Sequence, residues 1–117
     1  EKLLKVIDLV YTETIPDSFA LSRPDKNLDL FTDVALRQVL QVDIAGEGLI
    51  AKEYRVALKA GSSLTSLEVN EKSFLLADLT KRAAAITLDK HSLRPGDSAR
   101  LIIVEKKTEE TALERAH

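Results

Sequence analysis

The sequence predicts an all-β fold, an antiparallel β-sandwich of about seven or eight short strands with a charged C-terminal tail or short helix. Short runs rich in Val, Ile and Leu recur along the chain. Turn-forming residues separate these runs roughly every eight to twelve residues, which is typical of sandwiches and barrels. Several runs also alternate between apolar and polar residues, as a strand with one buried face does.

Composition indicates one domain with an aliphatic core. The 117 residues are 44% hydrophobic and 31% charged, the balance of an ordinary globular protein. Trp, Met and Cys are absent, and with two Tyr and three Phe the core must consist of Leu, Val, Ile and Ala. We expect a single β-sandwich domain over residues 1–107 and a charged tail or linker over residues 108–117.

Charge and cysteine content exclude several kinds of function. The net charge of −2 and the absence of long basic runs argue against a nucleic-acid-binding surface. Without cysteine there are no disulfides, thiolate metal sites or cysteine nucleophiles. No apolar stretch reaches the ~18 residues of a membrane span. Because the chain starts without Met, we expect a processed product or an excised piece of a longer protein.

The N-terminal residues divide into an apolar run and a turn-rich segment. Leu3–Thr14 is rich in β-branched and large apolar residues, which predicts a strand buried on both sides. Pro16–Asn27 contains two prolines, two aspartates and two serines, so it predicts a long connection, or alternatively a binding loop. Within it, Phe19, Ala20 and Leu21 are expected to anchor the connection to the core.

The segment Asp33–Gly46 fits either a helix or a strand. The strand is favoured because five apolar residues would share one face and only Gln38 would break the pattern. These five residues are Val34, Leu36, Leu40, Val42 and Ile44. The segment Leu49–Ala60 also alternates, with Tyr54, Val56, Leu58 and Ala60 on one face and Glu53, Arg55 and Lys59 on the other. The two segments, Val34–Ala45 and Leu49–Ala60, predict a hairpin around Gly46-Glu47-Gly48.

Further strands are expected in the second half of the chain. Leu64–Val69 predicts a short strand, Ser73–Leu79 is another apolar run, and Ala83–Leu88 predicts a strand or a partly helical approach to one. A polar connection then leads to a Pro95-Gly96 turn and a last strand from Leu101 to Val104.

Part of this region resembles a known family of modules. In Ile86–Ile103, a strand ending in Leu88-Asp89-Lys90 is followed by Ser92-Leu93, Pro95-Gly96-Asp97 and a further strand. This order resembles strand pairs of bacterial immunoglobulin-like modules over about twenty residues. The resemblance implies an immunoglobulin-like sandwich that acts as a spacer, adhesin or accessory domain, in the cell envelope or outside the cell.

Histidines and acidic residues do not form a recognisable site. His91 is in a polar turn and His117 is terminal, and neither has a second ligand at a useful spacing. Asp25, Asp29 and Asp33 recur every four residues, whereas calcium loops place ligands at alternate positions. The sequence therefore assigns no catalytic, cofactor-binding or metal-binding residue and predicts no cofactor.

Two other patterns have simple structural explanations. Gly46-Glu47-Gly48 lacks the third glycine of a dinucleotide-binding loop, so it is better explained as a hairpin turn. Lys81 and Arg82, together with Arg94 and Arg100, could form a small basic patch, although solvated strand ends are the favoured explanation of these residues.

These observations favour a non-catalytic structural, adhesive or assembly module that binds a protein partner or a neighbouring domain of its own chain. Leu3–Thr14 and Leu101–Lys107 are the predicted edge strands for such contacts, with Lys106 and Lys107 as edge protection. The alternative is a small β-barrel that binds a ligand or acts as an enzyme through an apolar pocket. Nucleic-acid binding on a barrel is disfavoured by the charge and by the few aromatic residues.

Overall fold

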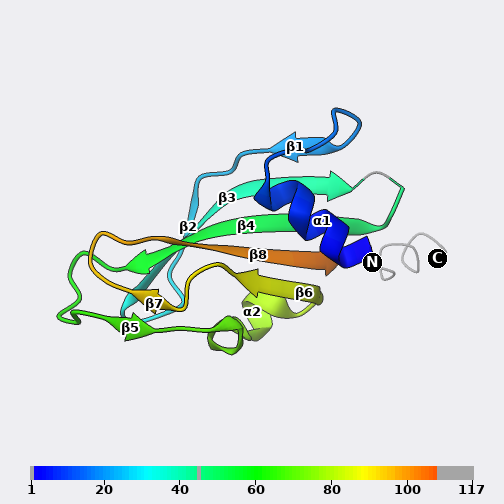
Figure 1. The fold of residues 1–117 in the computed structure, drawn as a ribbon. Coiled ribbons are helices and arrows are strands. Elements are labelled where there is room, and N and C mark those ends of the chain that lie inside the picture. Colours follow the sequence, from blue (N-terminus) through cyan, green and yellow to red (C-terminus); the bar gives the residue numbers. More distant parts are fainter. Residues whose placement is uncertain (1, 45, 108–117) are drawn as a thin grey trace.

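A six-stranded antiparallel sheet forms the centre of the molecule (Figure 1). The computed structural model describes residues 2–44 and 46–107. The strands of the sheet are β1 (Ala20–Ser22), β2 (Lys26–Leu28), β3 (Val34–Ile44), β4 (Leu49–Leu58), β6 (Ala83–Leu88) and β8 (Ala99–Lys106). Their order is β1-β3-β4-β8-β6, and β2 pairs with β3 beside β1. The sheet is open and does not close into a barrel.

The other elements lie on the two faces of this sheet (Figure 1). They are α1 (Lys2–Tyr11), β5 (Leu67–Glu68), the 3-10 helix η1 (Glu71–Phe74), α2 (Ala77–Thr80) and β7 (Ser92–Leu93). β5 and β7 form a separate two-stranded sheet. The protein is therefore mostly β, with antiparallel sheets, as the sequence predicted.

The predicted hairpin between β3 and β4 is confirmed. The two strands pair from Val34↔Leu58 to Ile44↔Leu49. Gly46 and Gly48, between the strands, have φ angles of 80° and 67°, which glycine adopts without steric cost. The strand prediction for Asp33–Gly46 was correct, because its alternating pattern outweighed the possible helix.

The prediction that the apolar residues of β3 share one face was wrong. The pairing with β4 shifts by one residue between Gln38 and Leu40, which makes a β-bulge. Because side chains alternate along a strand, one extra residue sends all later side chains to the opposite face. Leu36 therefore belongs to one hydrophobic core, whereas Leu40 and Val42 belong to another.

The two cores cover opposite faces of the sheet. In β8, Leu101 and Ile103 contribute to the first core, and the intervening Ile102 and Val104 contribute to the second. Phe74 of η1 packs in the first core, with residues of the β5–β7 sheet beside it. Helix α1 covers the second face, although only over the half that contains the hairpin end of β3 and β4 (Figure 1).

The N-terminal segment Leu3–Thr14 is not the predicted strand. It forms α1, with Leu3, Val6, Ile7 and Val10 packed in the second core. These positions follow the i, i+3, i+4, i+7 spacing of one helix face. The many β-branched residues favoured a strand, but burial of this one stripe against the sheet outweighs that propensity.

Several smaller predictions also need correction. Ser73–Leu79 is not a strand, because η1 and α2 occupy it and Asn70 caps η1 with a capping box to Ser73. Leu64–Val69 has only the two-residue strand β5. Pro16–Asn27 is not a simple connection, since it contains β1 and the first two residues of β2.

The predicted edges were also wrong. Leu101–Lys107 lies largely in β8, between β4 and β6, so Lys106 and Lys107 do not protect an edge. Within residues 2–44 and 46–107, the edges of the main sheet are β1 with β2 on one side and β6 on the other. The tail predicted for residues 108–117 lies outside the described residues.

The unit from Ala85 to Val104 has the predicted strand–turn–strand form. β6 and β8 pair antiparallel, with Ile86 opposite Ile103. Gly96 in the turn has a φ of 89°, and the Asp97 amide donates to the Arg94 carbonyl over 2.9 Å. The sequence did not show that the connection leaves the main sheet and contributes β7 to the second one.

Two adjacent substitutions test whether both faces of the sheet are covered. Leu101 and Ile102 are each 0% exposed but lie in different cores. Leu101→Ala and Ile102→Ala should each lower the free energy of unfolding in urea by about 2–5 kcal/mol. Leu4→Ala is the control, since Leu4 is 66% exposed. A cost below about 1 kcal/mol for either core variant would contradict the two-core structure.

Candidate functional site

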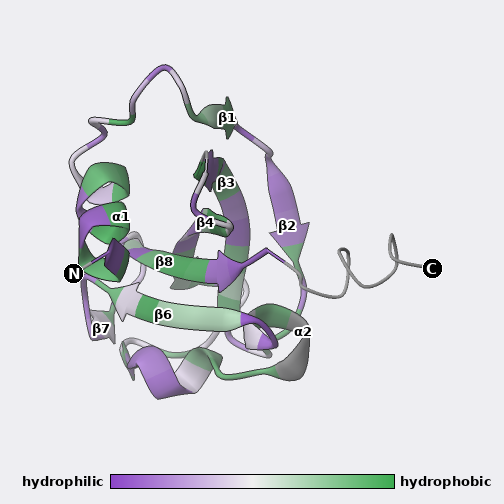
Figure 2. Ribbon diagram, turned by 90° about the vertical axis from the view of Figure 1, so that its right-hand side faces the viewer, coloured by the Kyte–Doolittle hydropathy of each residue, from purple (hydrophilic) through white to green (hydrophobic). Residues whose placement is uncertain are grey.

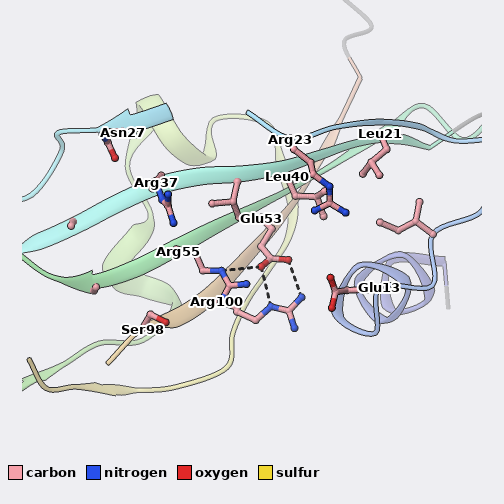
Figure 3. Close-up of a pocket in the computed structure, with 14 residues that line it drawn as sticks. Glu13, Leu21, Arg23, Asn27, Arg37, Leu40, Glu53, Arg55, Ser98 and Arg100 are labelled. Carbon is pink, nitrogen blue, oxygen red and sulfur yellow. Dashed lines mark hydrogen bonds and ion pairs between the residues drawn. The ribbon is translucent and has the colours of Figure 1, made fainter. Parts of the chain in front are cut away.

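A groove of about 590 Å³ lies on the sheet face that α1 covers only in part (Figure 3). β3 and β4 form its floor, and the chain after α1 lies on one side and β1 and β2 on the other. Its lining residues are Glu13, Ile15, Leu21, Arg23, Asn27, Ala35, Arg37, Val39, Leu40, Glu53, Arg55, Ala57, Ser98 and Arg100. The groove holds four arginines and two glutamates, in a chain whose net charge is −2.

The bulge in β3 explains why this face is apolar at one end and polar at the other. On the hairpin side of the bulge, Val42 and Ala51 face α1 and are buried. On the other side, Arg37 and Arg55 take the same face and are exposed beyond the helix. Val39 lies at the bulge and lines the groove. A one-residue irregularity thus separates the helix-covered half of the face from the charged half.

Three arginines form a row across the sheet. Arg37 of β3 is directly opposite Arg55 of β4, and Arg55 is directly opposite Arg100 of β8. Like charges in directly opposed positions on neighbouring strands destabilise a sheet. This row therefore opposes folding unless anionic groups compensate for it.

Glu53 compensates for one end of the row. Its buried carboxylate accepts a bidentate pair of hydrogen bonds from Arg100, 3.0 Å from Nε to Oε2 and 2.9 Å from Nη2 to Oε1 (Figure 3). Hydrogen bonding to Glu53 is the main cause of a raised pKa of Arg100, and partial burial opposes it. Bidentate arginine–carboxylate pairs are among the strongest polar contacts in proteins.

Arg100 also joins the sheet to the end of α1. Its guanidinium donates to the Tyr11 carbonyl over 3.0 Å and to the Val10 carbonyl over 3.3 Å. The same group lies 4.6 Å from the centre of the Tyr11 ring. Carbonyls in the last turn of a helix lack partners within the helix and favour a nearby cation. The charge of Arg100 and most of its hydrogen-bond donors are therefore already paired with groups of the domain itself.

The other three arginines have guanidinium N–H groups that are available for further hydrogen bonds. Arg55 Nε is 3.6 Å from the Glu53 carboxylate, which already binds Arg100. Among the described residues, Arg37 has an ion-pair contact with Asp25 over 3.2 Å, and both side chains are exposed. Arg23 has no ion-pair or hydrogen-bond partner among the residues that the structure describes. The groove therefore presents guanidinium groups that are free to bind an anion.

His91 and the three aspartates singled out from the sequence lie outside the groove and do not converge. His91 Nε2 is 3.3 Å from Glu71 Oε1, so the fold supplies a carboxylate that is distant in sequence. Glu71 also accepts from the Leu88 amide over 3.3 Å. Its pKa is lowered chiefly by its own backbone amide, with smaller contributions from His91 and Leu88. These contacts link η1 to the end of β6. His117 is outside the described residues.

The three aspartates have separate partners. Asp25 contacts Arg37, Asp29 accepts from Lys59 over 2.8 Å, and Asp33 accepts from Ser62 over 2.9 Å. The hydrogen bond from Lys59 lowers the pKa of Asp29. Among the side chains that the structure describes, no three of His, Asp or Glu are grouped as metal ligands would be.

The four basic residues considered for a patch, with solvated strand ends as the favoured explanation, do not gather in the groove. Of the four, Arg100 lines the groove, whereas Lys81, Arg82 and Arg94 do not. Sequence reasoning missed Arg23, Arg37 and Arg55. The alternation had placed Arg55 on the outer face of its strand, but its position opposite Arg37 depends on the bulge, which the pattern did not reveal.

Comparison with known proteins identifies the family of this chain. A family model described as the TraK C-terminal domain matches residues 1–105. The chain belongs to this family. TraK is a bacterial conjugative transfer protein, so this TraK C-terminal domain is a β-rich, assembly-related domain of a larger protein. The match names no immunoglobulin-like family. No match was found among curated proteins or among solved structures.

The described part of this TraK C-terminal domain contains no helix with the length and hydrophobicity of a membrane span. α1, the longest described helix, has ten residues.

The link between Glu53 and Arg100 can be tested by a double-mutant cycle. Arg100→Met should lower the free energy of unfolding by about 3–5 kcal/mol, because it leaves a buried carboxylate without its main partner. Glu53→Leu combined with Arg100→Met should cost less than the two single variants together. Arg94→Met, in an exposed turn, is the control. Additive costs in urea unfolding would show that the two side chains are not coupled.

Proposed function

We propose that this TraK C-terminal domain is a non-catalytic assembly module that binds a protein partner at the edge formed by β1 and β2. The membership of a conjugative transfer family supports an assembly role. We choose this surface because the edge is exposed and lies next to the charged groove.

The β1–β2 edge has the features of a surface for strand addition. All three residues of β1 are exposed, and both strands pair only with β3 among the described strands. Residues 23–25 interrupt the edge opposite the bulge of β3, and Pro24 has no amide hydrogen to donate. Unpaired backbone groups on such an edge bind an extended segment of another chain through main-chain hydrogen bonds.

The opposite edge is less suited to this role. Five residues of β6 are half-buried and Leu88 is buried. The Leu88 amide already donates to Glu71 of η1. In β2 by contrast Lys26 and Asn27 are exposed, and the strand is largely hydrophilic (Figure 2).

The groove itself does not favour the enzymatic or ligand-binding alternative. Its volume is within the range of small-molecule sites, about 300–1,000 Å³. Such sites are mostly apolar with a few polar groups, whereas this groove has six charged side chains. It is also open beside an edge strand and is not the interior of a barrel. An immunoglobulin-like sandwich and a location in the cell envelope stay predictions.

Site-specific photocross-linking in donor cells tests the proposed surface. A photoreactive amino acid is placed at Ser22 or Lys26 of the full-length parent protein, and at Lys72 or Lys81 as controls on the η1–α2 side. We expect a discrete protein adduct from Ser22 and Lys26 only, and its loss in cells that lack the other transfer proteins. Adducts from the control positions alone, or none from the edge, would refute the proposed surface.

A further inference from the structure

We propose that the groove recognises an acidic, extended segment of the protein partner, with carboxylates bound by Arg23, Arg37 and Arg55. This inference rests on the proposed function, because the groove adjoins the edge at which the partner would bind. It adds the chemistry of that partner: at least two Asp or Glu side chains close together in the segment that enters the groove.

The charge of the arginine row is only partly compensated within the groove. Neighbouring strands are about 4.8 Å apart, so Arg37, Arg55 and Arg100 start from backbone positions close to one another. The one buried carboxylate in the groove, Glu53, is bound bidentately by Arg100. Arg37 has only an exposed contact with Asp25, which contributes little in water. Further anions from outside the domain would relieve the remaining repulsion.

The available guanidinium groups lie on one surface of the groove. Figure 3 shows Arg37 and Arg55 rising from the floor and Arg23 approaching from the β1 side, so the three define one cationic surface. The side chains of Arg37 and Arg55 are 49% and 45% exposed, which leaves them accessible to a ligand. Guanidinium groups match carboxylates in a planar, bidentate arrangement.

The lining of the groove favours a peptide over a nucleic acid. Phosphates would also bind these arginines, but single-stranded nucleic acids are usually held by aromatic side chains that stack on the bases. None of the lining residues is aromatic. Ile15, Leu21 and Val39 provide apolar contacts suited to aliphatic side chains, and the adjacent strand edge suits a peptide backbone. An acidic peptide is therefore the occupant that fits both the charge and the surroundings.

Peptide binding to the intact protein tests this inference. The probe is a fluorescent decapeptide of alternating Glu and Thr, compared with decapeptides in which Gln or Lys replaces Glu. Fluorescence anisotropy is measured at low and high salt, and inorganic phosphate and a ten-nucleotide oligo-dT serve as other anions. The variants are Arg37→Gln with Arg55→Gln, and a control with the same charge change, Lys72→Gln with Lys81→Gln.

We expect the Glu peptide to bind, and the Gln and Lys peptides to bind at least about tenfold more weakly, as loss of one charge-assisted contact implies. Arg37→Gln with Arg55→Gln should weaken Glu-peptide binding by about tenfold or more and remove most of its salt dependence. The control pair should bind like the unaltered protein. The thermal midpoint of the arginine variant should not fall, because two members of a repulsive row are removed.

Four results would overturn the inference: no binding of the Glu peptide, equal binding of the Glu and Gln peptides, unchanged binding by the arginine variant, or tighter binding of oligo-dT or phosphate. The cross-linking experiment separates this outcome from failure of the proposed function. If Ser22 and Lys26 still form the partner adduct when Arg37 and Arg55 are replaced, the edge surface stands and only the acidic recognition is refuted.

Discussion

The Arg100 guanidinium holds together parts of the molecule that are distant in sequence. It binds the buried Glu53 carboxylate bidentately and the last carbonyls of α1. A buried carboxylate without a partner destabilises the fold, so Glu53 holds the Arg100 guanidinium in place. Arg100 in turn fixes where α1 ends on the sheet, through its hydrogen bonds to the last carbonyls of the helix. α1 therefore covers only the hairpin half of the face, and the rest stays open as the groove.

The bulge in β3 is the second constraint on which the groove depends. At Val39 the bulge sends the following side chains of β3 to the opposite face of the sheet. The strand therefore contributes to two cores and also carries an arginine on the groove floor. Opposite it, residues 23–25 interrupt the edge strand. Bulges commonly end regular pairing and redirect side chains next to functional sites. The bulge in β3 therefore divides this face of the sheet into a part that is buried and a part that is available to a partner.

The sequence predicted those parts of the fold that depend on local patterns. Alternation and glycines identified the β3–β4 hairpin, and the Pro95-Gly96 turn identified the return to β8. α1 was missed because its β-branched residues favour strands, although its one-sided spacing was visible. β1 and β2 were missed because three-residue strands are stabilised by pairing with β3. The arginine row was missed because cross-strand register is a non-local property.

The β1–β2 edge and its groove are the proposed surface through which this domain joins a larger assembly. Hydrogen–deuterium exchange of the full-length protein, alone and in the assembled transfer apparatus, tests this proposal most directly, because strand addition protects amides that are otherwise open to solvent. We predict slower exchange on assembly for residues 20–28, with β6 unchanged. Unchanged exchange in residues 20–28, with new protection confined to β6 or the η1–α2 side, would contradict the claim.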